Sequence, residues 1–253
     1  MSMKTFSLPV MTLILVVSLC LIGCSKDSSV KEEIEKESEV CNPFDFVGEL
    51  HNQGLDAIYG NLIETKASSV SEDEIIKLAN AFCDDVFSKD ERFSVNIPYT
   101  KSGDYDYDET DEVTISEEVS NYIDVIMSVA STEDYDFIKE QFSVFEEDII
   151  LTKTSVYSVY EANLLLCSLA IGKYSNEYWN EYNVATKSAA GELVGADLGG
   201  AIVGIKRHAL EILLCGVIGG VGSGLAAAGK AALGPALGAS ALAGLAIGMG
   251  ELF

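Results

Sequence analysis

The stretch ILLCGVIGGVGSGLAAAGKAALGPALGASALAGLAIGMG, residues 212–250, decides which kind of fold this chain can adopt. Its 39 residues contain a single charge, Lys230, and consist mainly of Gly and Ala. Lys230 and the pair Gly234-Pro235 divide the stretch into segments 212–229 and 231–250, which predicts a helical hairpin. Each arm is about 27–30 Å long at 1.5 Å per residue, a length that matches the hydrocarbon core of a bilayer.

Small residues recur every four positions in the Gly/Ala-rich tail, residues 186–253, and this spacing places them on one helix face. Such a face lets two helix backbones approach closely, as in the small-xxx-small motif of membrane helices. The residues predicted to pack in this way are Gly191, Gly195, Gly199, Gly216, Gly220, Gly224, Gly244 and Gly248. Two settings remain open for segment 212–250: a bilayer, although few of its residues favour transfer strongly, or close-packed helices within a soluble or oligomeric body.

Residues 42–184 show helical periodicity with an N-terminal signal before each apolar run. Pro43 follows Asn42 as the first residue of a helix, and Ser71 opens a capping box with Glu74. Further helices are predicted to begin at Ser116–Glu118 and at Thr132–Asp134, and a fifth to run from about Ser155 to Lys173. The sequence therefore predicts an all-α fold: an acidic bundle of about five helices, followed by a glycine-zipper helical hairpin.

The N-terminus has the pattern of a secretory signal. Lys4 precedes an apolar run without charge, Phe6–Ile22, and the run ends in Leu21-Ile22-Gly23-Cys24. This ending resembles the lipobox of bacterial lipoproteins, which implies removal of residues 1–23 and lipidation of Cys24. Residues 24–41 then form an acidic tether, which resembles the surface-export signal of lipoproteins in Bacteroidota. The resemblance implies a cell-envelope location at the outer membrane, with surface exposure as an extension of that prediction.

The net charge of −24 lies entirely before residue 185, because acidic and basic residues balance after that point. So acidic a domain is a poor partner for nucleic acid, which proteins bind by neutralising phosphates with Lys and Arg. Of the cysteines after Cys24, Cys41 and Cys83 lie near polar segments and form the more plausible disulfide of an exported protein. Cys167 and Cys215 lie in apolar runs and are expected to be buried. No Cys/His spacing predicts a metal site.

Two further patterns were considered as sites. The acidic run Asp104-x-Asp106-x-Asp108 has the first ligand spacings of an EF-hand loop, but Glu109 and Ile115 occupy the positions of its defining Gly and Glu. It is therefore predicted to be a solvated loop. The segment Asn42–Asn52, NPFDFVGELHN, resembles a motif of uncharacterised exported proteins of Bacteroidota, some with glycine-rich tails. That resemblance implies no activity, and His51 is predicted to be hydrogen-bonded inside the bundle.

The sequence contains no G-x-S-x-G, H-E-x-x-H or phosphate-binding motif, so neither a catalytic residue nor a cofactor is predicted. The leading hypothesis is a non-enzymatic, lipid-anchored envelope protein. Its partner is the membrane, bound through the N-terminal lipid, with a second membrane contact or a homo-oligomer formed through residues 212–250. The alternative is a membrane-active protein, because the tail resembles the apolar hairpins of pore-forming bacteriocins. A third hypothesis, an enzyme that uses His51, lacks an identifiable nucleophile.

Overall fold

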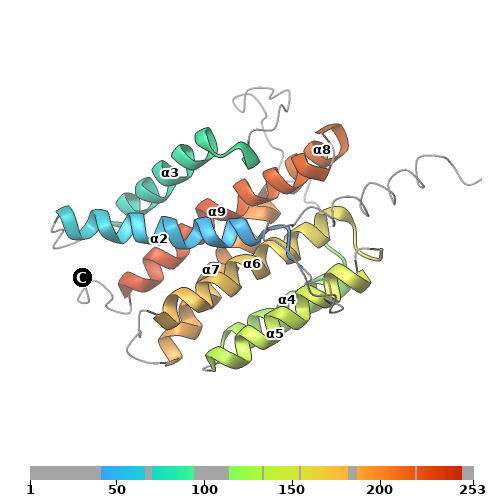
Figure 1. Cartoon of the computed structure of the whole chain (residues 1–253), viewed down its shortest axis with the longest axis horizontal. Helices are drawn as coiled ribbons and strands as arrows, with labels where there is room; N and C mark the ends of the chain where they lie inside the picture. Colours follow the sequence, from blue (N-terminus) through green and yellow to red (C-terminus); the bar gives the residue numbers. More distant parts are fainter. Residues whose placement is uncertain are drawn as a thin grey trace, which may run out of the picture. The chain divides into compact units, whose positions relative to one another are not determined.

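The structure is a computed structural model of the chain, and it describes residues 41–65, 70–93, 114–132, 134–153, 155–181, 187–219 and 221–246. The chain divides into a unit Met1–Cys41 and a unit Asn42–Phe253, and the second is described here. Every regular element of the described residues is helical, which confirms the all-α class (Figure 1). The predictions for Cys24, for the rest of residues 1–40 and for the Asp104–Asp108 loop lie outside the described residues.

Five α-helices precede the tail, in the order that the capping signals predict. Ser71 Oγ accepts a hydrogen bond from the Glu74 amide at 3.3 Å, and the Glu74 carboxylate accepts one from the Ser71 amide at 3.1 Å, which completes the predicted capping box. Ser116 and Asp134 cap the next two helices. The helices are α2 (Asp45–Thr65), α3 (Glu72–Lys89), α4 (Glu117–Ala130), α5 (Tyr135–Asp148) and α6 (Val159–Glu181), with a short 3-10 helix at Glu91–Phe93 and a π-helical turn at Ile149–Lys153.

The bounds predicted for the fifth helix, about Ser155 to Lys173, were wrong at both ends. The helix begins later because Ser158 forms a capping box with Glu161: the Ser158 amide donates to the Glu161 carboxylate at 3.0 Å, and Ser158 Oγ accepts from the Glu161 amide at 3.2 Å. It continues to Glu181 because Ser175, Asn176 and Trp179 extend its buried face. The apolar pattern ends at Lys173 because this part of the buried face carries polar residues, which have partners inside the bundle.

The tail forms three helices, α7 (Lys187–Arg207), α8 (Ala209–Gly219) and α9 (Val221–Ala246). The predicted hairpin break at Lys230 and Gly234-Pro235 was wrong, because α9 runs through both positions. Gly204 of α7 lies opposite Pro235 and leaves room for its ring, since a Cβ at Gly204 would lie 2.8 Å from that ring. The Lys230 ammonium lies 5.5 Å from the centre of the Phe87 ring, so the charge makes a cation–π contact at the edge of the core.

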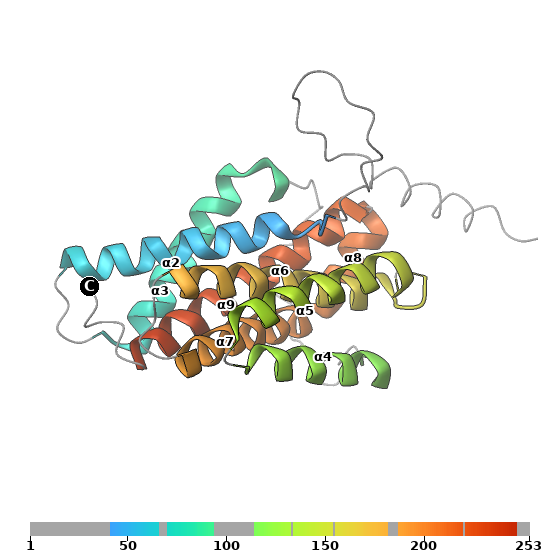
Figure 2. The same cartoon turned by 60° about the horizontal axis from the view of Figure 1, so that its bottom comes forward.

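The core is built around α9, which contacts α2, α3, α6, α7 and α8 and lies among them in both views (Figures 1 and 2). Its inward face carries small and medium-sized apolar side chains, and those with no exposed surface are Ala228, Ala232, Leu233, Ala236, Leu237 and Ala241. Within the described residues, Gly222–Ala246 is the one helical stretch long and apolar enough to cross a membrane, and 61% of its 18-residue apolar window is buried inside the bundle. A helix with these properties is also what the centre of a soluble bundle requires.

Candidate functional site

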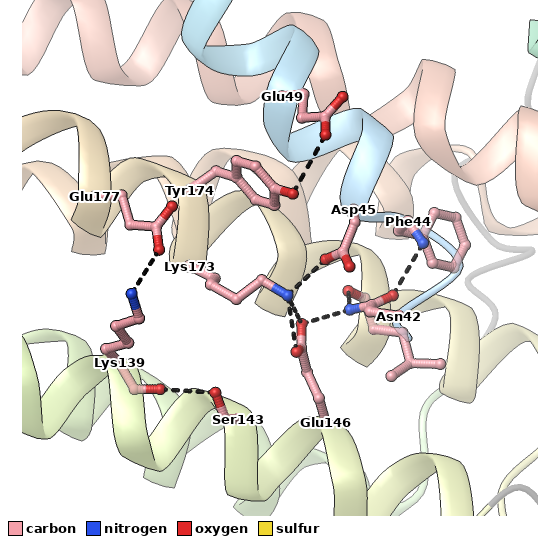
Figure 3. A network of polar contacts seen from close by, with 11 residues as sticks. Asn42, Phe44, Asp45, Glu49, Lys139, Ser143, Glu146, Lys173, Tyr174 and Glu177 are labelled. Carbon is pink, nitrogen blue, oxygen red and sulfur yellow. Dashed lines mark hydrogen bonds and ion pairs between the residues drawn. The ribbon is translucent and has the colours of Figure 1, made fainter. Parts of the chain in front are cut away.

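The N-terminal segment Asn42–Asn52 is the start of α2, and its polar side chains reach α5, α6 and α7. Asn42 Oδ1 accepts a hydrogen bond from the Phe44 amide at 3.0 Å, which caps the helix entrance. Asn42 Nδ2 donates to Glu146 Oε1 at 2.6 Å and to the Leu166 carbonyl at 2.8 Å (Figure 3). One amide side chain therefore joins the start of α2 to both α5 and α6.

Lys173 of α6 completes this junction, which we call the clamp (Asn42, Asp45, Glu146 and Lys173). Its ammonium donates to Asp45 Oδ1 at 2.6 Å and to Glu146 Oε2 at 2.9 Å (Figure 3). Burial raises the pKa of the Glu146 carboxyl above its ordinary value, although Lys173 and Asn42 act against the shift. Burial also opposes the charge of Lys173, but the two carboxylates outweigh it and raise the pKa of the ammonium. The clamp is thus a partly buried group of three charges, in which loss of Lys173 would leave the buried Glu146 carboxylate without its cation.

Gly48 lets α2 lie directly against α6. A Cβ at this position would lie 2.6 Å from the Ala170 carbonyl oxygen and would also strike the Tyr174 ring. One turn further on, Asn52 Nδ2 donates to the Tyr174 carbonyl at 2.9 Å, and Tyr174 Oη donates to Glu49 at 3.5 Å. The glycine and the asparagine of the segment therefore serve close helix packing.

His51 and Asp197 form a second buried group, the core pair. His51 Nε2 lies 3.5 Å from Asp197 Oδ1, and neither side chain has any exposed surface. Ser175 Oγ donates a short hydrogen bond to Asp197 Oδ2, which also lies 3.4 Å from Trp179 Nε1. His51 Nδ1 is 3.2 Å from Asn52 Oδ1, so the prediction that His51 is hydrogen-bonded inside the bundle is confirmed.

The core pair and Ser175 together provide a serine, a histidine and an aspartate, but not in the order that nucleophilic catalysis requires. A catalytic serine needs the histidine as its base, with the aspartate behind the histidine. Here Asp197 lies between Ser175 and His51, and all three are buried. Burial, together with the nearby Asp197 charge, also raises the pKa of Tyr59, whose ring packs edge-on against Trp179 with centroids 6.2 Å apart. The arrangement joins α2, α6 and α7 rather than presenting groups to a substrate.

The glycines predicted to pack do so unequally. Gly191 approaches α4, since a Cβ there would lie 3.0 Å from the Thr132 carbonyl oxygen, whereas Gly195 and Gly199 have nothing within 4 Å. The close approach of α7 to α9 instead uses Gly200 and Gly204. Gly244 packs against Tyr59 and Trp179, Gly224 is buried, and nothing is described for the surroundings of Gly216, Gly220 and Gly248.

His208 and the cysteines lie outside the clamp and the core pair. His208 occupies the break between α7 and α8, where its Nδ1 lies 3.2 Å from Glu211. Cys83, Cys167 and Cys215 are buried, and burial raises the pKa of the Cys83 thiol to about 12. Cys41 is exposed and belongs to the other unit, so its disulfide with Cys83 stays a prediction. Within the described residues no group of three or more His, Cys, Asp or Glu side chains could hold a metal ion.

Sequence reasoning did not find the partners on α5, α6 and α7, namely Glu146, Lys173, Ser175 and Asp197. Asp197 carried a signal, because it is a lone carboxylate in an apolar helix and such a charge requires a partner. Glu146 and Lys173 carried none, since charged residues at helical spacing are common on solvated faces. Comparisons of the chain with protein-family models, with curated proteins and with solved structures give no match.

Proposed function

We propose that the chain is a lipid-anchored protein of the bacterial cell envelope, in which Cys24 carries the lipid and residues 42–246 form a non-enzymatic binding or structural unit. The observation that carries this proposal is the position of α9. It is the described helix that could span a bilayer, and it is instead the central helix of the bundle. Attachment to the membrane then falls to the lipid, which anchors stably when two or more acyl chains are present.

The internal use of polar groups supports a non-enzymatic role. In the clamp, Lys173 donates to the carboxylates of Asp45 and Glu146, and in the core pair Asp197 lies against His51. These polar groups are therefore used in contacts between α2, α5, α6 and α7. An enzyme of this size would need such groups to face a substrate. Surface recognition by a stable scaffold is the role that remains. In this proposal the glycine-rich tail associates with its own bundle, and a homo-oligomer formed through residues 212–250 would require α9 to leave it.

The anchor is tested by metabolic labelling with an alkyne fatty acid in a bacterial host that processes lipoproteins. The native chain and a Cys41→Ala control should take up label, and Cys24→Ala should not. Equal labelling of Cys24→Ala and the native chain would refute the anchor. Truncation after Arg207 should abolish cooperative unfolding, because it removes the central helix; a truncated chain that melts like the native one would refute the core role of α9.

A second candidate is a membrane-active protein, because Gly222–Ala246 has the length and the mean hydropathy, 1.2, of a spanning helix. Dye release from liposomes on addition of the full chain tests it. Ala239→Lys is the matched variant: Ala239 is half-buried, so the long side chain can reach water in the bundle, whereas a Lys at the centre of a spanning helix costs about 2.5–3.5 kcal/mol. Release by the native chain that Ala239→Lys abolishes would favour this function, and intact liposomes would remove it.

A further inference from the structure

The connection between α5 and α6, with the first residue of α6, carries the three most exposed large hydrophobic side chains of the described chain. Val156 is 64% exposed, Leu151 61% and Val159 51%, the three highest values among its large hydrophobic side chains. They lie within nine residues of one another in the sequence. Single exposed aliphatic residues are ordinary, but a group of them marks a surface for interaction.

Other side chains of the same turn are buried and attach it to the bundle. Ile149 has no exposed surface, and Tyr157 and Tyr160 are buried at 7% and 2% exposure. Tyr157 Oη also donates to Glu118 at 3.4 Å. Since Ile149, Tyr157 and Tyr160 pack into the core, the residues between them that face outward are held in place by the fold.

Charge is also unusual in this turn. The twelve residues from Ile149 to Tyr160 contain one charged residue, Lys153, in a chain whose net charge is −24. The carboxylates on either side point to internal donors: Asp148 accepts from Thr152 Oγ1 at 2.6 Å, and Glu161 accepts from the Ser116 amide at 2.8 Å. Burial works against the charge of Glu161, but amide donors outweigh it and hold its pKa at about 2. The turn is therefore an apolar, nearly neutral patch on an acidic surface.

The patch lies at the end of the unit that the anchor segment enters. Asn42, the first residue of the unit, is hydrogen-bonded to Glu146 and to the Leu166 carbonyl, which stand on either side of the turn. Leu151 follows Glu146 by five residues and Val159 precedes Leu166 by seven. At 1.5 Å per helical residue these offsets are about 8–11 Å. A lipid on Cys24, 18 residues before Asn42, would keep this end of the unit close to the bilayer.

We propose that Leu151, Val156 and Val159 form a membrane-contact patch, which docks the unit on the lipid surface beside its own anchor. This inference rests on the proposed lipid anchor. Aliphatic side chains gain free energy on leaving water for the interface, and the absence of acidic residues in the turn avoids repulsion by anionic headgroups. Docking would fix the orientation of the unit on the membrane and leave α3 and the far end of α2 facing water.

The test uses the full lipidated chain in phosphatidylcholine vesicles with and without brominated acyl chains. An environment-sensitive fluorophore is attached at Val156→Cys, in a Cys41→Ser background so that the exposed native thiol does not react. The matched control is Ile63→Cys, which is 43% exposed and lies near the other end of α2, about 27 Å from Asp45. A label at Leu151→Cys replaces Val156→Cys if that variant does not fold.

The expected result is a blue-shifted emission and a loss of intensity in brominated vesicles for the label at position 156, with neither change at position 63. Unchanged emission at position 156 in a chain that sediments with the vesicles overturns the patch and leaves the anchor intact. Equal quenching at positions 63 and 156 also overturns it. Failure to sediment and to take up fatty acid overturns the anchor, and the patch falls with it.

Discussion

Adding one methyl group to glycines of α7 should have opposite effects on the two sides of that helix. A Cβ at Gly200 would lie 2.6 Å from the Pro235 carbonyl oxygen and 2.8 Å from the Ala236 Cα. Both atoms belong to the backbone of α9, so neither can rotate away. At Gly199, one residue earlier, a Cβ would have nothing within 4 Å.

The magnitudes follow from two competing terms. Replacement of Gly by Ala within a helix gains about 1 kcal/mol of propensity. Overpacking in a close-packed core costs about 1–3 kcal/mol, because α7 and α9 must separate toward the ordinary carbon contact of roughly 3.5–4.0 Å. Gly200→Ala should therefore lose up to about 2 kcal/mol of unfolding free energy, and Gly199→Ala should gain up to about 1 kcal/mol. For a unit of this size each kcal/mol shifts Tm by about 2–4 °C.

The assay is thermal and urea unfolding followed by circular dichroism at the helical band, with the native chain as reference. Gly204→Ala should behave like Gly200→Ala, because its Cβ would also meet α9, and Gly195→Ala should behave like Gly199→Ala. A pair of variants at positions 199 and 200 that shift Tm in the same direction would refute the packing of α7 on α9.

Three further perturbations test the polar contacts, with the free energy of unfolding as the measurement. Glu161→Gln should cost about 1 kcal/mol of unfolding free energy at neutral pH, because it weakens the N-terminal caps of α4 and α6. The pKa of Glu161 is about 2 in the folded chain against an ordinary 4.5, so the difference in stability between the native chain and the variant should fade as the pH falls below 4.5. A difference that does not depend on pH would contradict this role. Lys173→Met should cost about 3–5 kcal/mol of unfolding free energy at pH 7, because Glu146 is then buried without its cation. Burial raises the pKa of Glu146, so protonation relieves this cost and the loss should shrink toward pH 4–5. An equal loss at both pH values would contradict the clamp. Asp197→Ala should cost about 3 kcal/mol by removing the acceptor of Ser175 Oγ and Trp179 Nε1, both of which are buried, and by taking away the carboxylate beside His51. A variant as stable as the native chain would show that these contacts contribute nothing.

The sequence predicted helix starts best, because a start depends on local chemistry. Ser71, Ser116 and Asp134 each accept a hydrogen bond from the amide three residues on, and their neighbours alone determine this geometry. The end of α6 and the continuity of α9 could not be predicted in this way. They depend on groups from distant helices, such as Gly204 opposite Pro235, whose relation exists only after the helices have packed.

The same contrast applies to the candidate site. The segment Asn42–Asn52 attracted attention as a motif, and the structure gives its residues a common purpose in fastening α2 to the helices behind it. The partner residues of these contacts lie 100 or more residues further along the chain, on α5, α6 or α7. Only Asp197 could have been suspected beforehand, because a carboxylate within an apolar helix must be paired.

The glycines of α9 lie on several faces of the helix, which differs from the arrangement of a membrane zipper. A zipper needs its small residues on one face, as the four-residue spacing predicts. In the structure the glycines act in several directions: a Cβ at Gly229 would meet Val47 and Phe93, Gly234 faces Cys83 of α3, and Gly244 meets Tyr59 and Trp179. Each glycine costs about 1 kcal/mol of helix propensity relative to Ala, and insertion into lipid would leave these different notches empty. Because large side chains of the surrounding helices already fill them, the glycine pattern of α9 is accounted for by the bundle, and any membrane activity would first have to overcome that packing.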